Sequence, residues 1–290
     1  SARANARRVG RSPRTRGRPT RRRRARNQGR ARSAMVRALE AAAVNAAEHP
    51  ETERLAGAAL PLHLRPVRRL VVPKHRLARV RDGNAHVGDV IVTEFQTAGR
   101  GRLDRTFEAP KGTALLFSFY IQPQRNRDDW GWIPLIAGYS VAKTLHAFHA
   151  TVKWPNDILI NNKKVSGLIA EVVGDGVVIG IGINVGMSED QLPVETATSL
   201  LVEGGVDLTR DEILCEVLEE FEDHFLQWDQ GIDEVQALYV QLCGTLGKEV
   251  RVEYPGGATH LAIAESISDI GALILDDGTH VQSADVIHLR

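Results

Sequence analysis

The chain has only two cysteines among its 290 residues, and aromatic side chains make up 5% of it. Cys215 and Cys243 both lie in apolar stretches typical of helices, so neither a disulfide framework nor a CxxC metal site is predicted. No apolar run reaches the length of about 18 residues that a membrane-spanning helix needs, and the N-terminal residues lack the apolar stretch of a secretory signal. These absences predict a soluble, cytoplasmic protein without membrane contact.

Acidic residues are absent from the start of the chain, where residues 1–33 carry 14 arginines. The remainder then holds 23 lysines and arginines against 36 aspartates and glutamates, so the body of the protein is acidic. Residues 1–34 have almost no large apolar side chains to bury and are predicted to be disordered. Two interpretations remain open for them, a solvated extension or a nucleic-acid-binding arm whose arginines neutralise phosphates. Interleaved aromatic residues are missing, so nucleic-acid binding is not favoured.

From about residue 88 onward the sequence has the texture of a globular fold. Apolar and β-branched runs predict strands, periodic apolar positions predict two helices, and Thr209 with Glu212 has capping-box spacing. The continuous apolar character of the two strands around Gly174-Asp175-Gly176 indicates a hairpin covered on both faces. The expected strands are 89–95, 114–121, 165–173, 177–185, 249–254, 259–267, 272–275 and 280–289, and the expected helices are 132–148 and 209–228.

Four short segments carry the residue types of a binding site. The first, QTAGRGRLDR at 96–105, alternates glycines with arginines, which suits a loop that approaches an anionic ligand closely. The second, KWPND at 153–157, offers Lys153 as a cation and Asn156 as an amide that pairs with an adenine edge. Either segment alone is also consistent with an ordinary solvated loop or turn.

The other two segments place glycine inside apolar strands. They are Lys164-Val165-Ser166-Gly167 and Gly180-Ile181-Gly182-Ile183-Asn184. Glycine in a strand marks the close approach of a ligand or of another part of the chain. For each segment alone, close packing of the sheet is the favoured explanation. Taken together, four such segments at strand ends within 90 residues predict one shared site.

In this order and at these separations, the four segments resemble the biotin protein ligase family, and the resemblance covers about residues 89–290. It implies an α+β fold, with a mixed sheet flanked by helices similar to the class II synthetases, followed by a small SH3-like β-barrel. The implied domains are a disordered extension at 1–34, a catalytic domain at 89–244 and a barrel at 245–290. Residues 35–88 have no assigned fold.

The resemblance also implies a reaction. ATP activates biotin as biotinyl-5′-adenylate, and the biotinyl group then passes to a lysine of a biotin carboxyl carrier domain. The substrates are ATP and biotin, with Mg²⁺ carried by ATP rather than by a protein metal site. The resemblance is compatible with a homodimer. A lipoate or octanoyl ligase relative is the alternative enzyme, and a nucleic-acid-binding protein that acts through the basic arm is the alternative of another class.

Site roles follow from the resemblance, residue by residue. Arg102, Lys164 and Arg100 are the expected catalytic residues, with Arg102 stabilising charge in the transition state, and Asp157 is the expected base. The expected biotin-binding residues are Gln96, Gly99, Arg100, Gly101, Arg102, Lys164, Gly167, Gly180 and Ile183. The expected ATP-binding residues are Arg102, Arg105, Lys153, Asn156, Asn184 and Arg290.

The sequence departs from the family upstream of these motifs. Family members carry a Ser-Thr-Asn element about 20 residues before the glutamine of QTAGRGR, where it hydrogen-bonds the ring of biotin; this chain reads Val72-Pro73-Lys74-His75-Arg76 there. Two hypotheses follow: a pocket with fewer polar partners for biotin, or a segment before residue 88 that is not in the native reading frame. The second is favoured by the Arg-rich start. Phe107 also stands where a tryptophan is usual.

Overall fold

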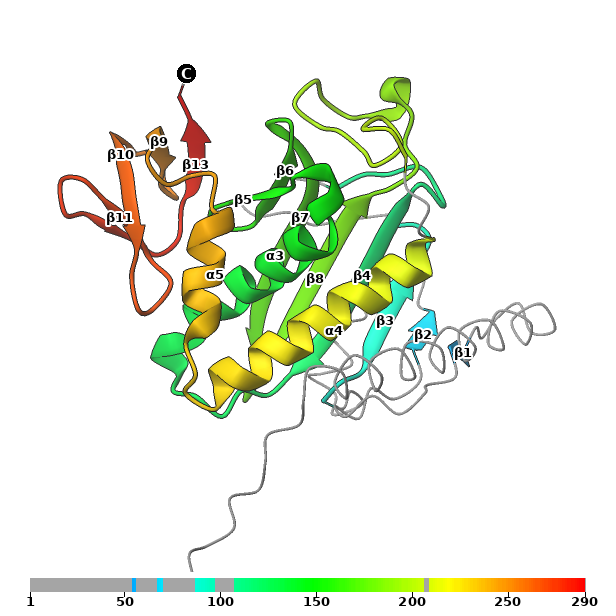
Figure 1. The fold of residues 1–290 in the computed structure, drawn as a ribbon, viewed down its shortest axis with the longest axis horizontal. Helices are drawn as coiled ribbons and strands as arrows, with labels where there is room; N and C mark the ends of the chain where they lie inside the picture. The colour runs from blue at the N-terminus through cyan, green and yellow to red at the C-terminus, as the bar shows by residue number, and fades with distance from the viewer. Residues whose placement is uncertain (1–53, 56–66, 70–86, 97–106, 206–208, 290) are drawn as a thin grey trace, which may run out of the picture.

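The computed structural model describes residues 54–55, 67–69, 87–96, 107–205 and 209–289 (Figure 1). They form an eight-stranded mixed sheet with three α-helices, followed by a separate five-stranded sheet, as the resemblance predicts. The strands are β1 Arg54–Leu55, β2 Val67–Arg69, β3 Val90–Thr93, β4 Ala114–Ile121, β5 Thr151–Lys153, β6 Asp157–Ile160, β7 Lys163–Val173, β8 Gly176–Asn184, β9 Glu249–Glu253, β10 Thr259–Ile267, β11 Leu273–Leu275, β12 His280–Val281 and β13 Asp285–His288. The helices are α3 Trp132–Thr144, α4 Arg210–Asp229 and α5 Glu234–Leu242, with 3₁₀ turns η1 Arg127–Gly131, η2 His146–Phe148 and η3 Glu189–Gln191.

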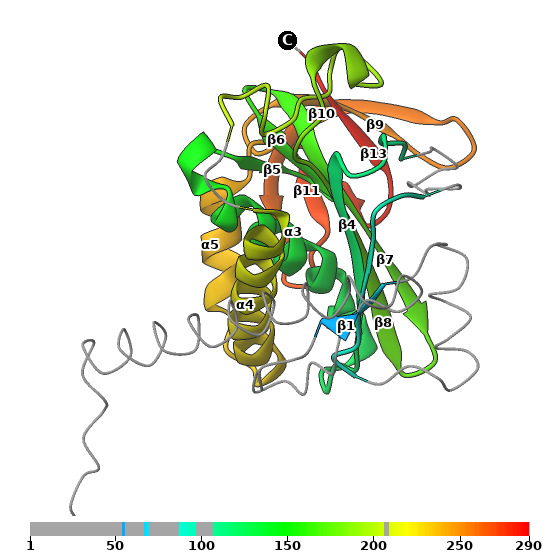
Figure 2. The ribbon, with the colours of Figure 1, turned by 90° about the vertical axis from the view of Figure 1, so that its right-hand side faces the viewer.

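The large sheet has the strand order β1-β2-β3-β4-β8-β7-β6-β5, in which only the β2–β3 pair is parallel. The helices α3 and α4 lie together on one face of it (Figure 2). Every residue of β4 and β8 is buried, which confirms the cover on both faces that the hairpin predicts for β8, whereas β7, its partner in the hairpin, is only partly buried. No described helix is both long enough and apolar enough to cross a membrane.

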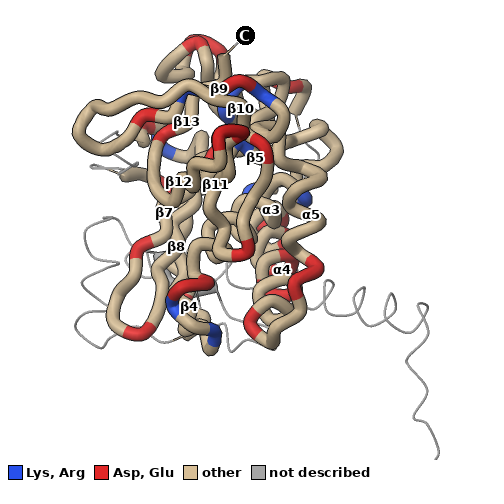
Figure 3. Tube along the Cα trace, turned by 90° about the vertical axis from the view of Figure 1, so that its left-hand side faces the viewer, with Lys and Arg blue, Asp and Glu red and all other residues tan. Residues whose placement is uncertain are grey.

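The helices form for reasons that are visible in the sequence. Almost all of α3 is buried, as expected for a helix that is apolar on every side. The helix α4 begins with the predicted capping box, in which the Thr209 hydroxyl accepts from the Glu212 N–H and the Glu212 carboxylate accepts from the Thr209 N–H. Its predicted apolar stripe, which includes Phe221 and Phe225, faces the core, while acidic residues follow its outer side (Figure 3).

Five details of the predicted elements were wrong or missing. The helix expected at 132–148 ends at Thr144 and continues as the short 3₁₀ turn η2. The strand expected at 280–289 is interrupted and forms β12 and β13. Val172, near the closed end of the β7–β8 hairpin, is 58% exposed, because that end lies away from the helices (Figure 2). The helix α5 and the three-residue strand β5 were not predicted.

The five-stranded sheet, of order β12-β11-β10-β9-β13, docks on the first domain through the turn between β10 and β11. Two indole N–H groups donate to backbone carbonyls of this turn, from Trp132 to Asp269 at 2.7 Å and from Trp154 to Gly271 at 3.1 Å. Both tryptophans are buried. The apolar core is therefore continuous across the two domains.

Gly131 packs closely against the C-terminal sheet domain at this interface. A methyl group there would overlap the backbone carbonyl oxygen of Ile270, which no rotamer change can move. We expect Gly131→Ala to lower the free energy of unfolding by about 1–3 kcal/mol, as overpacking does, measured by urea denaturation. Gly186→Ala is the matched control, because its methyl group would make only ordinary contacts. Equal stability of the two variants would contradict this account of the interface.

Candidate active site on the open face of the sheet

Four strands contribute residues to the face of the large sheet that lies opposite the helices. The side chain of Leu168 in β7 faces α3, so its neighbour Gly167 faces away from the helices. Gly167 pairs with Asp157 of β6 and with Gly182 of β8, and Asp157 pairs with Lys153 of β5. Residues directly opposite each other project to the same face of a sheet. Lys153, Asp157, Gly167 and Gly182 therefore form one row across the face of the sheet away from the helices, which we call the open face.

Lys164 joins this row because of an irregularity in the strand pairing. In a regular strand, residues three apart point to opposite faces. The register between β6 and β7 shifts between Ile158 and Leu159, so that Lys164 pairs with Leu159 although Gly167 pairs with Asp157. A bulge of this kind re-aims side chains. Lys164 is thereby placed on the open face beside Gly167.

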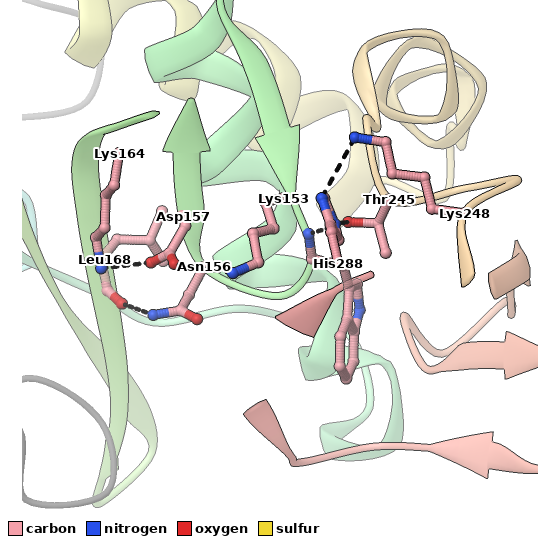
Figure 4. Close-up of polar contacts among 9 residues, drawn as sticks. Lys153, Asn156, Asp157, Lys164, Leu168, Thr245, Lys248 and His288 are labelled. Carbon is pink, nitrogen blue, oxygen red and sulfur yellow. Dashed lines mark hydrogen bonds and ion pairs between the residues drawn. The ribbon is translucent and has the colours of Figure 1, made fainter. Parts of the chain in front are cut away.

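The result is a carboxylate between two ammonium groups (Figure 4). The Lys164 Nζ lies 2.6 Å from Asp157 Oδ1, and the Lys153 Nζ lies 3.9 Å from Asp157 Oδ2. The three groups carry one net positive charge, and the Lys164 side chain is 40% exposed. An ammonium has three N–H donors, so Lys164 can hold Asp157 and still donate to an anionic ligand. The cluster can therefore bind a carboxylate or phosphate oxygen.

Gly167 lies directly beside the Lys164 side chain. A methyl group at this position would lie 2.8 Å from both Cε and Nζ of Lys164. The glycine in β7 thus leaves room for the lysine side chain. At Gly182 the corresponding neighbour is the ring of Phe107, whose carbons would lie within 2.8 to 3.2 Å of a methyl group. The Phe107 ring therefore lies on the open face, beside Gly182.

The two asparagines are fixed by hydrogen bonds. The Asn156 side chain donates from Nδ2 to the Leu168 carbonyl at 3.0 Å, and the Asn156 backbone carbonyl accepts from the Leu168 N–H at 3.0 Å. It borders a pocket of about 290 Å³ that is also lined by Glu171 and by Ser283 of the C-terminal domain. Asn184 is buried and donates from Nδ2 to the Thr198 carbonyl at 2.9 Å.

The remaining predicted residues divide into three groups. Gly180 pairs with Ile169 and lies on the open face. The side chain of Ile183 is fully buried among apolar residues on the helix side, so only the backbone of Ile183 can take part in binding. Gln96 is partly buried just before the Gly/Arg loop. Gly99, Arg100, Gly101, Arg102, Arg105 and Arg290 lie outside the described residues.

The C-terminal domain contributes residues that the sequence did not predict. Thr245 Oγ1 accepts from the Trp154 N–H at 3.0 Å and lies 3.0 Å from His288 Nε2. The Lys248 ammonium, which can only donate, lies 3.4 Å from His288 Nδ1, so Nε2 carries the proton that His288 donates to Thr245 (Figure 4). This chain of contacts attaches the turn that carries Lys153 to the C-terminal sheet. No local motif marks Thr245 or His288, because their partners are distant in sequence.

Burial, with the charges of Lys248 and Lys153, lowers the pKa of His288 to about 4. The ordinary histidine pKa is about 6.5, so between these two values the unfolded chain binds the proton that the folded protein excludes. We therefore expect the contribution of His288 to stability to be fully present above about pH 6.5 and to be lost as the pH falls toward 4. Denaturant unfolding of His288→Gln across this range should show a flatter pH dependence than the wild type. His280→Gln, at an exposed position of the same domain, should retain the wild-type slope, and a wild-type slope in His288→Gln would contradict the assignment.

Comparison with known proteins places these features in a family. Residues 69–188 match the Biotin/lipoate A/B protein ligase family, and residues 245–289 match the Biotin protein ligase C terminal domain. The chain is 36% identical over 224 residues to the Biotin--[acetyl-CoA-carboxylase] ligase of Mycobacterium tuberculosis, which covers 74% of this chain and 84% of that protein. It is 31% identical over 227 residues to the Bifunctional ligase/repressor BirA of Bacillus spizizenii, covering 73% and 69%.

Solved structures agree with the sequence comparisons. The biotin protein ligase from Aquifex aeolicus in complex with biotin and ATP superposes with a TM-score of 0.65 and 28% identity, covering 77% of this chain and 97% of that one. By sequence and by fold, this chain belongs to the biotin protein ligase family.

Proposed function

We propose that this protein activates biotin with ATP as biotinyl-5′-adenylate and transfers the biotinyl group to a lysine of a biotin carboxyl carrier domain. The observation that carries the proposal is the Lys153–Asp157–Lys164 cluster on the open face of the sheet. A biotin carboxylate and a triphosphate are both anions, and they repel each other on approach. A site with net positive charge at fixed positions counters this repulsion without reorganisation during the reaction.

In the first step a biotin carboxylate oxygen attacks the α-phosphorus of ATP, a P–O bond forms, and pyrophosphate leaves with the electrons of the broken P–O bond. Lys164 donates to the oxygens on which charge develops, and Arg102 acts from the Gly/Arg loop by resemblance. Asn156 and Asn184 bind the adenine edge. Each charge-assisted hydrogen bond from Lys164 or Arg102 to these oxygens would contribute about 1.5–3 kcal/mol.

In the second step the acceptor lysine amine attacks the acyl carbon and AMP leaves. Free lysine has a pKa near 10.4, so only a small fraction of it is neutral at pH 7. Asp157 is the proposed base. Its Oδ1 already accepts from Lys164, so Oδ2 is the oxygen that would take the proton.

Mg²⁺ enters the proposal as a partner of the ATP phosphates, where it neutralises charge on the triphosphate and on the pyrophosphate that leaves. Asp157 is engaged by two lysines, so the phosphate oxygens of ATP would supply most of the ligands of the ion. We also propose that the protein is cytoplasmic and forms a homodimer.

Lipoate is the alternative acyl substrate, because the family that matches residues 69–188 includes both biotin and lipoate ligases. The match of residues 245–289 to the C-terminal domain of biotin ligases favours biotin. The test is transfer of labelled biotin or labelled lipoate, with ATP and Mg²⁺, to a carboxyl carrier domain and to its Lys→Arg variant. We expect label from biotin only, and only on the carrier that has its lysine; label from lipoate alone would overturn the proposal.

A further inference from the structure

The segment 196–200 contacts the backbone of Lys164 on both sides. The Lys164 N–H donates to the Thr196 carbonyl at 2.7 Å, and the Thr198 N–H donates to the Lys164 carbonyl at 2.9 Å. Ala197 forms a parallel β-bridge with Lys164 between these two bonds. The position of Lys164 on the open face therefore depends on the segment 196–200 as well as on the strand β7.

The same segment also holds Asn184. The Thr198 carbonyl accepts from Asn184 Nδ2 at 2.9 Å, and the Leu200 N–H donates to the Asn184 carbonyl at 3.0 Å. Thr198 thus uses its N–H for Lys164 and its carbonyl for Asn184. A shift of this one residue would move both predicted ligand-binding groups relative to each other.

The Thr198 side chain fixes the segment in place. Thr198 is fully buried, and its hydroxyl donates to Glu203 Oε1 at 2.6 Å. The other oxygen of that carboxylate, Oε2, accepts from Asn161 Nδ2 at 2.7 Å. Asn161 lies in the turn between β6 and β7, three residues before Lys164, and adopts a left-handed backbone with φ of 50°. The Glu203 carboxylate therefore joins the segment 196–200 to the turn that leads into Lys164.

From these contacts we infer that Thr198 and Glu203 are positioning residues, which set the spacing between the Lys164 ammonium and the Asn184 amide. In the proposed reaction these two groups contact the reacting oxygens and the adenine of the same nucleotide, so their spacing determines how well ATP fits. The inference rests on the proposed function. Hydrogen bonds to a charged partner are stronger than neutral ones, so loss of the Thr198 hydroxyl removes one of the stronger contacts that hold this segment.

The test compares Thr198→Val with two matched variants in biotin-dependent ATP–pyrophosphate exchange. Valine removes the hydroxyl and keeps the shape. Thr198→Ser keeps the hydroxyl, and Thr196→Val makes the same change at an exposed side chain while leaving its carbonyl in place. We expect the KM for ATP to rise about tenfold in Thr198→Val, on the scale of one lost charge-assisted hydrogen bond, and to stay within about twofold of the wild type in the other two.

A second variant, Glu203→Gln, covers the case in which Thr198→Val does not fold. Its amide accepts from only one of the two donors that Glu203 joins, so a smaller rise in the KM for ATP is expected. A purely structural role would reduce the fraction of active enzyme and the midpoint of urea unfolding while leaving the KM for ATP unchanged, and that result would overturn the inference. Wild-type protein without any exchange would instead overturn the proposed function.

Discussion

The Lys164→Gln variant is expected to form the acyl-adenylate about 10 to 100 times more slowly than the wild type, the range that corresponds to one charge-assisted hydrogen bond. Glutamine keeps most of the side-chain length but removes the positive charge. The Asp157 carboxylate then loses the partner that lies 2.6 Å away. In the proposed reaction, the oxygens on which charge develops lose a cationic donor. The measurement is the rate of biotin-dependent ATP–pyrophosphate exchange at saturating ATP and biotin.

The neighbouring residue provides the control. Lys163 is exposed and lies next to Lys164 in β7, so Lys163→Gln makes the same chemical change with the same effect on net charge. It should keep the wild-type exchange rate. Equal losses in the two variants would mean that net charge, and not the position of Lys164, controls the reaction.

Arg102→Ala is expected to reduce the exchange rate by about 100-fold, the scale observed when one preorganised donor to a transition state is removed. The expectation rests on the match of the Gly/Arg loop to the family motif, since residues 97–106 lie outside the described part of the chain. Arg102→Lys is the informative companion, because lysine keeps the charge but lacks the planar pair of donors that suits phosphate and carboxylate oxygens. It should recover only part of the activity. An unchanged exchange rate in Arg102→Ala would mean that Arg102 is not a catalytic residue.

Much of the fold could be predicted because its signals are local. The strands β4 and β8 are apolar along most of their lengths, β7 is apolar in its interior, and the start of α4 is marked by Thr209 and Glu212. The strand β5 was missed because three residues are too few to show a period. The docking of the C-terminal sheet depends on indole N–H groups that meet backbone carbonyls more than 100 residues away, and no local pattern encodes such a contact.

The site was predictable in its residue types but not in its geometry. Lys153, Asp157, Lys164 and Gly167 were expected at one site, and the structure brings them into contact. The pairing of Lys164 with Asp157 depends on the register shift between β6 and β7, which cannot be read from spacing alone. The side chain of Ile183 lies on the helix side of the sheet, because successive residues of β8 point to alternate faces and its neighbours Gly182 and Asn184 point to the open face.

In the proposed reaction, Lys153, Asp157, Lys164 and Asn184 surround one adenylate joined to biotin. This arrangement is tested most directly by the exchange of labelled pyrophosphate into ATP by the wild-type protein, with biotin as the varied component. Label should enter ATP only when biotin is present, with saturation as the biotin concentration rises. If pyrophosphate exchange never occurs, or proceeds equally well when biotin is left out, these four residues do not bind an acid that is activated as its adenylate.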